Sequence, residues 1–203
     1  MEYLQLGHPR SINRSLINYE YGLRWNNRFE EVVEPHTEEY ARRFFETVGP
    51  PGRVQAVAAA PALRKEQPLF TVTFSSRHPD WNNNVFTVEI LNDGGSPLEN
   101  FSFSPYGEGE IFLFSYRQNE YAAADTKTMH THSDHQRTWT FLEDGSSNFR
   151  ERDDFTRSPQ RSWARDFPLE RLIFKQPSFG DWESLVDIGP LPGVSDYAGI
   201  KFT

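Results

Sequence analysis

The chain has 203 residues, no cysteine, and 29 acidic against 21 basic residues, which gives a formal net charge of −8. The lack of cysteine excludes disulfide bonds, thiolate metal sites and cysteine nucleophiles. The negative charge opposes binding to the phosphate backbone of nucleic acids and favours a basic partner, or simply solubility.

No apolar stretch approaches the ~18 residues that a membrane helix needs. The first residues lack the basic and apolar regions of a signal peptide. We therefore expect a cytoplasmic protein that does not bind a membrane.

The N-terminal part of the chain is ambiguous over residues 11–34. Ile12, Leu16 and Tyr19 have helical spacing, but several asparagine and serine residues weaken a helix. Residues 21–25 equally suit a strand.

The clearest helix pattern covers residues 37–48. Thr37 is a good N-cap residue, and two glutamates follow it in the first turn, where the helix dipole favours acidic groups. Tyr40, Phe44 and Val48 lie at i, i+4 and i+8, with Ala41 and Phe45 flanking them, and we expect the Tyr40/Phe44 stripe to contact a sheet. The Gly-Pro-Pro-Gly run at 49–52 ends the helix.

The middle of the chain predicts β-strands. Phe70, Val72 and Phe74 alternate with polar residues, and residues 85–90 repeat the pattern. Because alternate strand residues point to opposite faces, each run has one apolar and one polar face. Further strands are predicted at 53–60, 101–103 and 111–116.

The last third predicts shorter elements. Residues 138–142 and 171–175 favour strands. Ser158 and Pro159 resemble a helix start and favour a short helix to Asp166. Asp181 precedes a second predicted helix at 182–188.

Together these elements predict a mainly β, α+β fold in a single domain, residues 1–203. We expect a curved antiparallel sheet with the 37–48 helix on one face and short C-terminal helices at an edge.

Three of the six histidines, His130, His132 and His135, lie within six positions. On a strand His130 and His132 share a face and can bind a metal such as zinc. The alternative is a polar loop with solvated histidines. The letters H-x-H-x-D-H resemble the metal motif of the metallo-β-lactamase superfamily over six residues. That resemblance implies one metal on His130 and His132 and a second on Asp134 and His135, but the family's later histidines have no counterpart here.

The connection at 77–84 contains Trp81, Asn82 and Asn83. An aromatic ring beside several amides suits stacking on, and hydrogen bonding to, a sugar or a peptide. The alternative is a turn whose tryptophan packs at the margin of the core.

A charged segment follows at 149–157, with Arg150, Arg152, Asp153 and Asp154. These residues suit a charged partner surface or an acid–base pair. The alternative is a solvated strand edge or turn, where charges deter edge pairing.

No phosphate-binding glycine loop or Gly-x-Ser-x-Gly motif is present. The first hypothesis is therefore a non-catalytic binding protein without a cofactor, of the inhibitor or immunity type, with a basic protein as partner. The alternatives are a metal-dependent enzyme that uses the histidines and a small-ligand or carbohydrate binder that uses Trp81.

Overall fold

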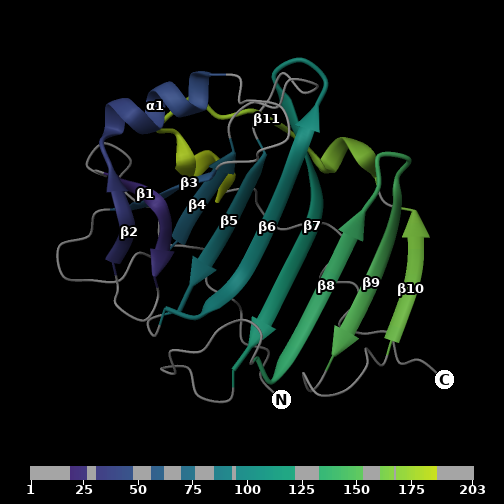
Figure 1. The fold of residues 1–203 in the computed structure, drawn as a ribbon. Helices are drawn as coiled ribbons and strands as arrows, with labels where there is room; N and C mark the ends of the chain where they lie inside the picture. The colour runs from purple at the N-terminus through teal and green to yellow at the C-terminus, as the bar shows by residue number, and fades with distance from the viewer. Residues whose placement is uncertain are drawn as a thin grey trace.

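The computed structural model describes residues 19–26, 31–47, 56–61, 70–75, 85–92, 95–121, 133–152, 161–166 and 168–186. Most of these residues form one antiparallel sheet, with helix α1 beside β1–β4 (Figure 1). The predicted mainly β, α+β class is confirmed.

The sheet has the strand order β10-β9-β8-β7-β6-β5-β4-β3-β1-β2, and β11 pairs with β7 outside this order. Consecutive strands from β3 to β10 are therefore neighbours joined by antiparallel pairing. The strands are β1 (Tyr19–Asn26), β2 (Glu31–His36), β3 (Ala56–Pro61), β4 (Phe70–Ser75), β5 (Phe86–Leu91), β6 (Pro97–Tyr106), β7 (Glu110–Glu120), β8 (His135–Phe141), β9 (Ser146–Arg152), β10 (Arg161–Asp166) and β11 (Ile173–Lys175).

One face of the sheet, here called the aromatic face, carries a continuous row of buried side chains. Directly opposed residues point to the same face, so strand register alone defines the row. The row consists of Tyr21, Ala59, Val72, Val88, Phe101, Tyr116, Trp139 and Phe149. The predicted apolar sides of β4 and β5 belong to this face and are confirmed as buried, except that Ile90 is half-buried.

Helix α1 (Glu38–Glu46) begins where its cap predicts. The Thr37 hydroxyl accepts a hydrogen bond from the Tyr40 backbone N–H at 3.2 Å. The Arg42 side chain forms a 2.9 Å ion pair with Glu38, one turn earlier.

The predicted contact stripe of α1 is right for Phe44 and wrong for Tyr40. Ala41 and Phe45 are buried, whereas Tyr40 is 47% exposed and rests on His36 with ring centroids 4.5 Å apart. Phe45 and Phe44 both contact Phe74 of β4, at 5.6 Å and 6.2 Å between ring centroids, and Phe44 is half-buried. Two adjacent stripes of α1 carry apolar residues, and the position of the sheet decides how deeply each residue is buried. Val48 lies outside the described residues.

A short 3-10 helix, η4 (Trp182–Leu185), closes the core beside α1. Trp182 is fully buried and stacks on Phe74 at 4.9 Å, with Phe45 at 5.7 Å. The predicted helix at 182–188 is thus a 3-10 helix over its described part, and Asp181 makes no side-chain cap hydrogen bond. Contact with Phe74 also places η4 over β4 rather than at the predicted sheet edge.

The predicted helix from Ser158 to Asp166 is wrong, because residues 161–166 form β10. Each of them lies opposite a residue of β9, from Arg161 opposite Glu151 to Asp166 opposite Ser146. The backbone hydrogen bonds of a six-residue pairing outweigh a local capping signal, which is a weak preference. β9 is therefore an interior strand and not the expected strand edge or turn.

The other elements differ from the sequence predictions mainly in length. The ambiguous N-terminal region is strand over β1 and β2, and the expected strand at 101–103 extends over the ten residues of β6. Of the predicted strands at 53–60, 138–142 and 171–175, β3, β8 and β11 confirm residues 56–60, 138–141 and 173–175. Arg171 instead ends the 3-10 helix η3 (Leu169–Arg171).

Gly22 permits the close approach of β1 and β2. A Cβ atom there would run into the Val32 side chain and lie 2.8 Å from the Val33 carbonyl oxygen.

Among the described residues, no helix has the length and apolar character required to cross a bilayer.

Candidate functional site

Most residues of the predicted sites lie outside the described part of the chain, and their roles stay predictions. These are Trp81, Asn82, Asn83, His130, His132, Asp153 and Asp154. The strands beside them still fix the geometry: residues 76–84 connect β4 to β5 at one end of the sheet, and residues 122–132 connect β7 to β8 at the other. The tryptophan and histidine segments therefore join the sheet at opposite ends.

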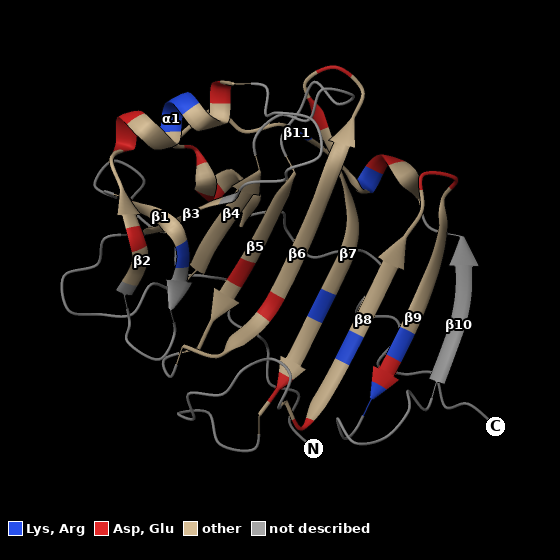
Figure 2. Ribbon diagram, in the orientation of Figure 1, with Lys and Arg blue, Asp and Glu red and all other residues tan. Residues whose placement is uncertain are grey.

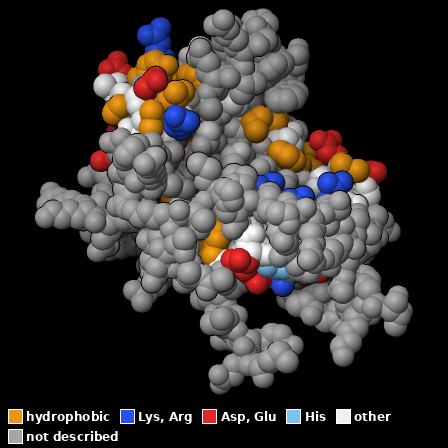
Figure 3. Space-filling model, turned by 60° about the horizontal axis from the view of Figure 1, so that its bottom comes forward, with side chains coloured by type: hydrophobic (Ala, Val, Ile, Leu, Met, Phe, Trp, Pro, Cys, Tyr) orange, Lys and Arg blue, Asp and Glu red, His pale blue; other side chains and the backbone are white. Residues whose placement is uncertain are grey.

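His135, the described member of the histidine cluster, begins β8 and faces the aromatic side of the sheet. Its Nε2 atom lies 3.1 Å from Glu151 Oε1, and its side chain is 18% exposed. At the end of the sheet where β7 finishes and β8 starts, Figure 3 shows a histidine next to acidic and basic side chains. Within the described residues, no three His, Asp or Glu side chains gather closely enough to hold a metal ion.

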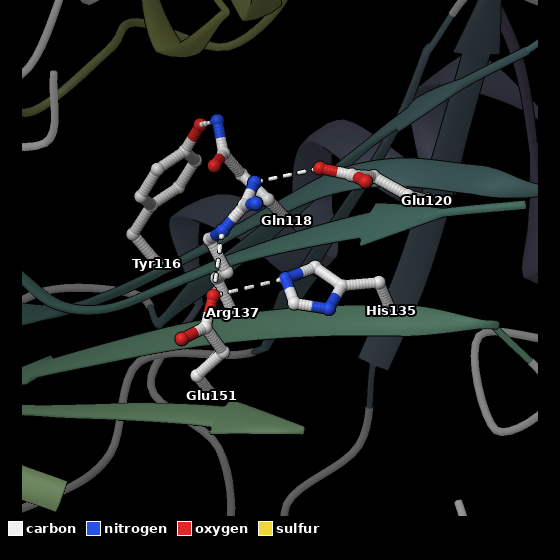
Figure 4. Close-up of polar contacts among 6 residues, drawn as sticks. All are labelled: Tyr116, Gln118, Glu120, His135, Arg137 and Glu151. Atoms are coloured by element: carbon white, nitrogen blue, oxygen red, sulfur yellow. Dashed lines mark hydrogen bonds and ion pairs between the residues drawn. The ribbon is translucent and has the colours of Figure 1, made fainter. Parts of the chain in front are cut away.

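Arg137 connects His135 to a wider ion network. Arg137 Nη1 lies 2.6 Å from Glu120 Oε1, and Arg137 Nε lies 3.3 Å from the same Glu151 oxygen that meets His135. Figure 4 shows Arg137 between the two carboxylates. Since one Glu151 oxygen meets both basic groups, the arrangement ties β7, β8 and β9 together and leaves Glu151 poorly placed as a general base.

Arg137 and Glu151 belong to a row of polar side chains that crosses the sheet to Glu99. Glu99, Gln118, Arg137 and Glu151 are directly opposed on β6 to β9. Gln118 Nε2 donates to the Tyr116 hydroxyl at 2.7 Å. Burial raises the pKa of the Glu99 carboxyl, and hydrogen bonds with Tyr116 and Gln118 offset part of this rise. Burial, with the nearby Glu99 charge as a smaller cause, also raises the pKa of Tyr116. We call Glu99, Gln118, Arg137 and Glu151 the polar row.

Arg150 and Arg152 point to the opposite face of the sheet from Glu151, because successive residues of a strand point to opposite faces. Arg150 lies opposite Thr138, and Arg152 lies opposite Gln136. The structure thus separates these two arginines from the ion network of Arg137, although they adjoin Glu151 in sequence.

A third group of charges gathers at the end of the sheet formed by the β6–β7 turn, the β8–β9 turn and η3 (Figure 2). All of its side chains are exposed. We call this group the acidic end; its carboxylates are Glu108, Glu110, Glu143, Asp144 and Glu170, and its cations are Arg171 and Lys175. Five carboxylates against two cations leave it negatively charged.

Backbone geometry fixes the turns of the acidic end. Gly107, Gly109 and Gly145 have φ values of 57°, 73° and 85°, a region that glycine enters without strain. The Gln176 N–H donates to the Gly109 carbonyl at 2.9 Å and holds the segment after β11 against the β6–β7 turn. These carboxylates are therefore carried on ordered turns.

Asp144 is fixed by its own turn. Its Oδ1 atom accepts hydrogen bonds from the Ser146 hydroxyl at 2.6 Å and from the Ser146 backbone N–H at 2.9 Å. These bonds favour the ionised form and lower the pKa of the carboxyl. Asp144 therefore keeps its negative charge in mildly acidic as well as neutral solution.

Sequence analysis missed the acidic end, because its residues are spread from 108 to 175. The available signal was that antiparallel strands place every second turn at the same end of a sheet, and two such turns read Gly-Glu-Gly-Glu and Glu-Asp-Gly.

Comparison with known proteins gave no match: no protein-family model, curated protein or solved structure aligns with this chain. Function is therefore inferred from the residues and geometry of the chain itself.

Proposed function

We propose that this chain is a non-catalytic binding protein of the cytoplasm, of the inhibitor or immunity type, whose acidic end receives a basic protein. The observation that carries the proposal is the gathering of five exposed carboxylates on ordered turns at one end of the sheet. The cysteine-free composition suits a reducing compartment.

The electrostatics favour a cationic partner. Opposite charges on two surfaces accelerate their encounter and exclude partners of the wrong sign. The charge of the acidic end has the sign of the whole chain, so the long-range field and the local field attract the same partner.

The acidic end also offers apolar contact area. Leu142, at the start of the β8–β9 turn, is 54% exposed beside Glu143 and Asp144. An apolar group surrounded by charge is the usual anatomy of a protein interface.

The turns are ordered before a partner arrives. Leu142 N–H donates to the Ser146 carbonyl at 2.9 Å, and Gly145 N–H donates to the Leu142 carbonyl at 3.0 Å. Little conformational entropy is then lost when the partner binds, which improves affinity without further contacts.

The test is capture from native lysate by the immobilised chain, with identification of the captured protein and titration of the purified pair. We expect a stoichiometric partner with a basic isoelectric point, whose affinity falls at least tenfold between low and high salt. Failure to capture a basic protein would overturn the proposal.

A pair of charge-matched triple variants locates the interface. Glu108→Gln/Glu143→Gln/Glu170→Gln removes three charges from the acidic end, and Glu20→Gln/Glu39→Gln/Glu46→Gln removes three exposed charges from β1 and α1. We expect the first variant to weaken binding at least tenfold and the second to change it less than threefold. Equal losses would show that total charge, and not the acidic end, governs binding.

A further inference from the structure

The sheet face opposite the aromatic face carries two parallel rows of polar side chains over β5 to β9. Strand register aligns the members of each row, and the rows lie two residues apart along every strand. The hydroxyl row is Thr87, Ser102, Ser115, Thr140 and Asn148. The arginine row is Glu89, Asn100, Arg117, Thr138 and Arg150.

Charge is distributed unevenly along the arginine row. Glu89 stands at one end, where it accepts a 3.5 Å hydrogen bond from Asn100, and the two arginines occupy the other end, over β7 and β9. In Figure 2 the basic positions of β7 and β9 lie on either side of β8, and the acidic position of β5 lies two strands away from β7. The β7–β9 part of this face is therefore cationic in a chain of net charge −8.

The two arginines are not neutralised by described carboxylates. Neither Arg117 nor Arg150 forms an ion pair within the part of the chain that the structure describes. Arg117 Nε is enclosed away from solvent and has no hydrogen-bond acceptor there. Because buried donors almost always have a partner, a guanidinium N–H in this position favours an anionic acceptor.

The spacing fits a small anion. Neighbouring strands lie about 4.8 Å apart, so the backbones at Arg117 and Arg150 are separated by about 10 Å, with the Thr138 hydroxyl between them. Long guanidinium side chains can converge over that distance on one phosphate or carboxylate, the groups that arginine binds best.

The hydroxyl row fits the remainder of the ligand. Successive positions on one face of a strand are about 7 Å apart, roughly the width of one sugar ring. Hydroxyl and amide side chains both donate and accept hydrogen bonds, as the hydroxyls of a sugar do. Neither row contains an aromatic ring, and Glu89 repels a long polyanion such as a nucleic acid.

We propose that this face binds a small anionic sugar, with its phosphate or carboxylate between Arg117 and Arg150 and its hydroxyls over Ser115 and Thr140. The site is separate from the acidic end and does not depend on the function proposed for it.

Isothermal titration calorimetry of the full chain tests the site. The probes are hexose phosphates, hexuronates, neutral hexoses and inorganic phosphate. We expect phosphate-bearing or carboxylate-bearing sugars to bind, neutral hexoses not to bind, and inorganic phosphate to bind at least fivefold more weakly than the better anionic sugar. The two anionic panels distinguish a sugar phosphate from a uronate. Absence of binding by both panels, or equal affinity for inorganic phosphate, would overturn the proposal.

Two variants assign the binding to this face. Arg117→Gln/Arg150→Gln should weaken the anionic sugar at least tenfold, whereas Arg171→Gln/Lys175→Gln, with the same charge change at the acidic end, should leave its affinity within twofold. Ser115→Ala/Thr140→Val should reduce the preference for the sugar over inorganic phosphate. Circular dichroism verifies that each variant is folded. Equal loss in both charge variants would refute the site.

Discussion

Two halves of the aromatic face begin from the same alternating strand pattern and end in different environments. Over β4, the rings of Phe74, Phe45, Phe179 and Trp182 close on one another at 4.9–6.4 Å between centroids. Over β7 to β9 the buried rings continue, but the residue two positions along each strand, on the same face, belongs to the polar row. Position on the sheet, and not the alternation itself, decides whether a side chain is sealed in the core or joined to a charge network.

The difference between the halves indicates a division of roles. Apolar contacts are non-directional and stabilise the half beneath α1 in proportion to the area that they bury. Hydrogen-bonded charges add little net stability but fix which residues oppose one another. We therefore infer that the polar row helps to set the register of β6 to β9, and the following predictions test this division.

The largest effect is expected from Phe74→Ala, in the half beneath α1. Phe74 is fully buried against Trp182 and Phe45, so the substitution leaves a cavity and should cost about 3–5 kcal/mol in the free energy of unfolding. Urea denaturation measures this loss. Thr73→Ala, one position away on the opposite face, should cost less than ~1 kcal/mol. Similar losses at both positions would contradict the assigned faces.

Two positions of helix α1, five residues apart, should show the same contrast between a buried and an exposed side chain. Phe45→Ala removes a buried ring and should cost about 3 kcal/mol, while Tyr40→Ala removes an exposed one and should cost less than ~1 kcal/mol. Thermal unfolding of the two variants measures the difference. A larger loss for Tyr40→Ala would restore the stripe expected from the sequence.

A smaller effect is expected in the polar row. Arg137→Met removes the ion pairs to Glu120 and Glu151, and since these side chains are 22–58% exposed, the loss should be about 1 kcal/mol. The loss should shrink in high salt when urea denaturation is repeated there. A loss comparable to that of Phe74→Ala would show that this half also depends on Arg137 for its core stability.

The smallest effect concerns Glu99→Gln and depends on pH. The folded-state pKa of Glu99 lies above its ordinary value of 4.5 because of burial, so the folded protein retains this proton longer than the unfolded chain. Wild-type stability should therefore fall as the pH rises from about 4.5 through the folded-state pKa, and the Gln variant should lack this decrease. Unfolding measured from pH 4 to 8 reports the difference, which should be greatest at the upper end.

Tyr116→Phe sharpens this test. The Tyr116 hydrogen bond lowers the pKa of Glu99, so its removal should shift the decrease in stability to higher pH. An unchanged pH profile in both variants would show that Glu99 is solvated in solution.

The sequence predicted much of the sheet and little of the sites. Alternation identified β4 and β5, a more apolar run identified β7, and cap residues identified the start of α1. β10 was predicted as a helix, since Ser158 and Pro159 report a local preference whereas β10 is stabilised by pairing with β9. The acidic end and the arginine row combine residues from several strands, so neither is visible in any single segment.

By itself the sequence determined the mainly β class, the apolar sides of the central strands and the absence of cysteine chemistry, because these depend on composition and on residues two or four apart. Tertiary structure alone decided which stripe of α1 meets the sheet, where η4 lies, and how Arg137, Arg150 and Glu151 divide between the two faces. Those outcomes depend on which strands are neighbours, and strand order is set by the long-range burial of side chains that no local pattern records.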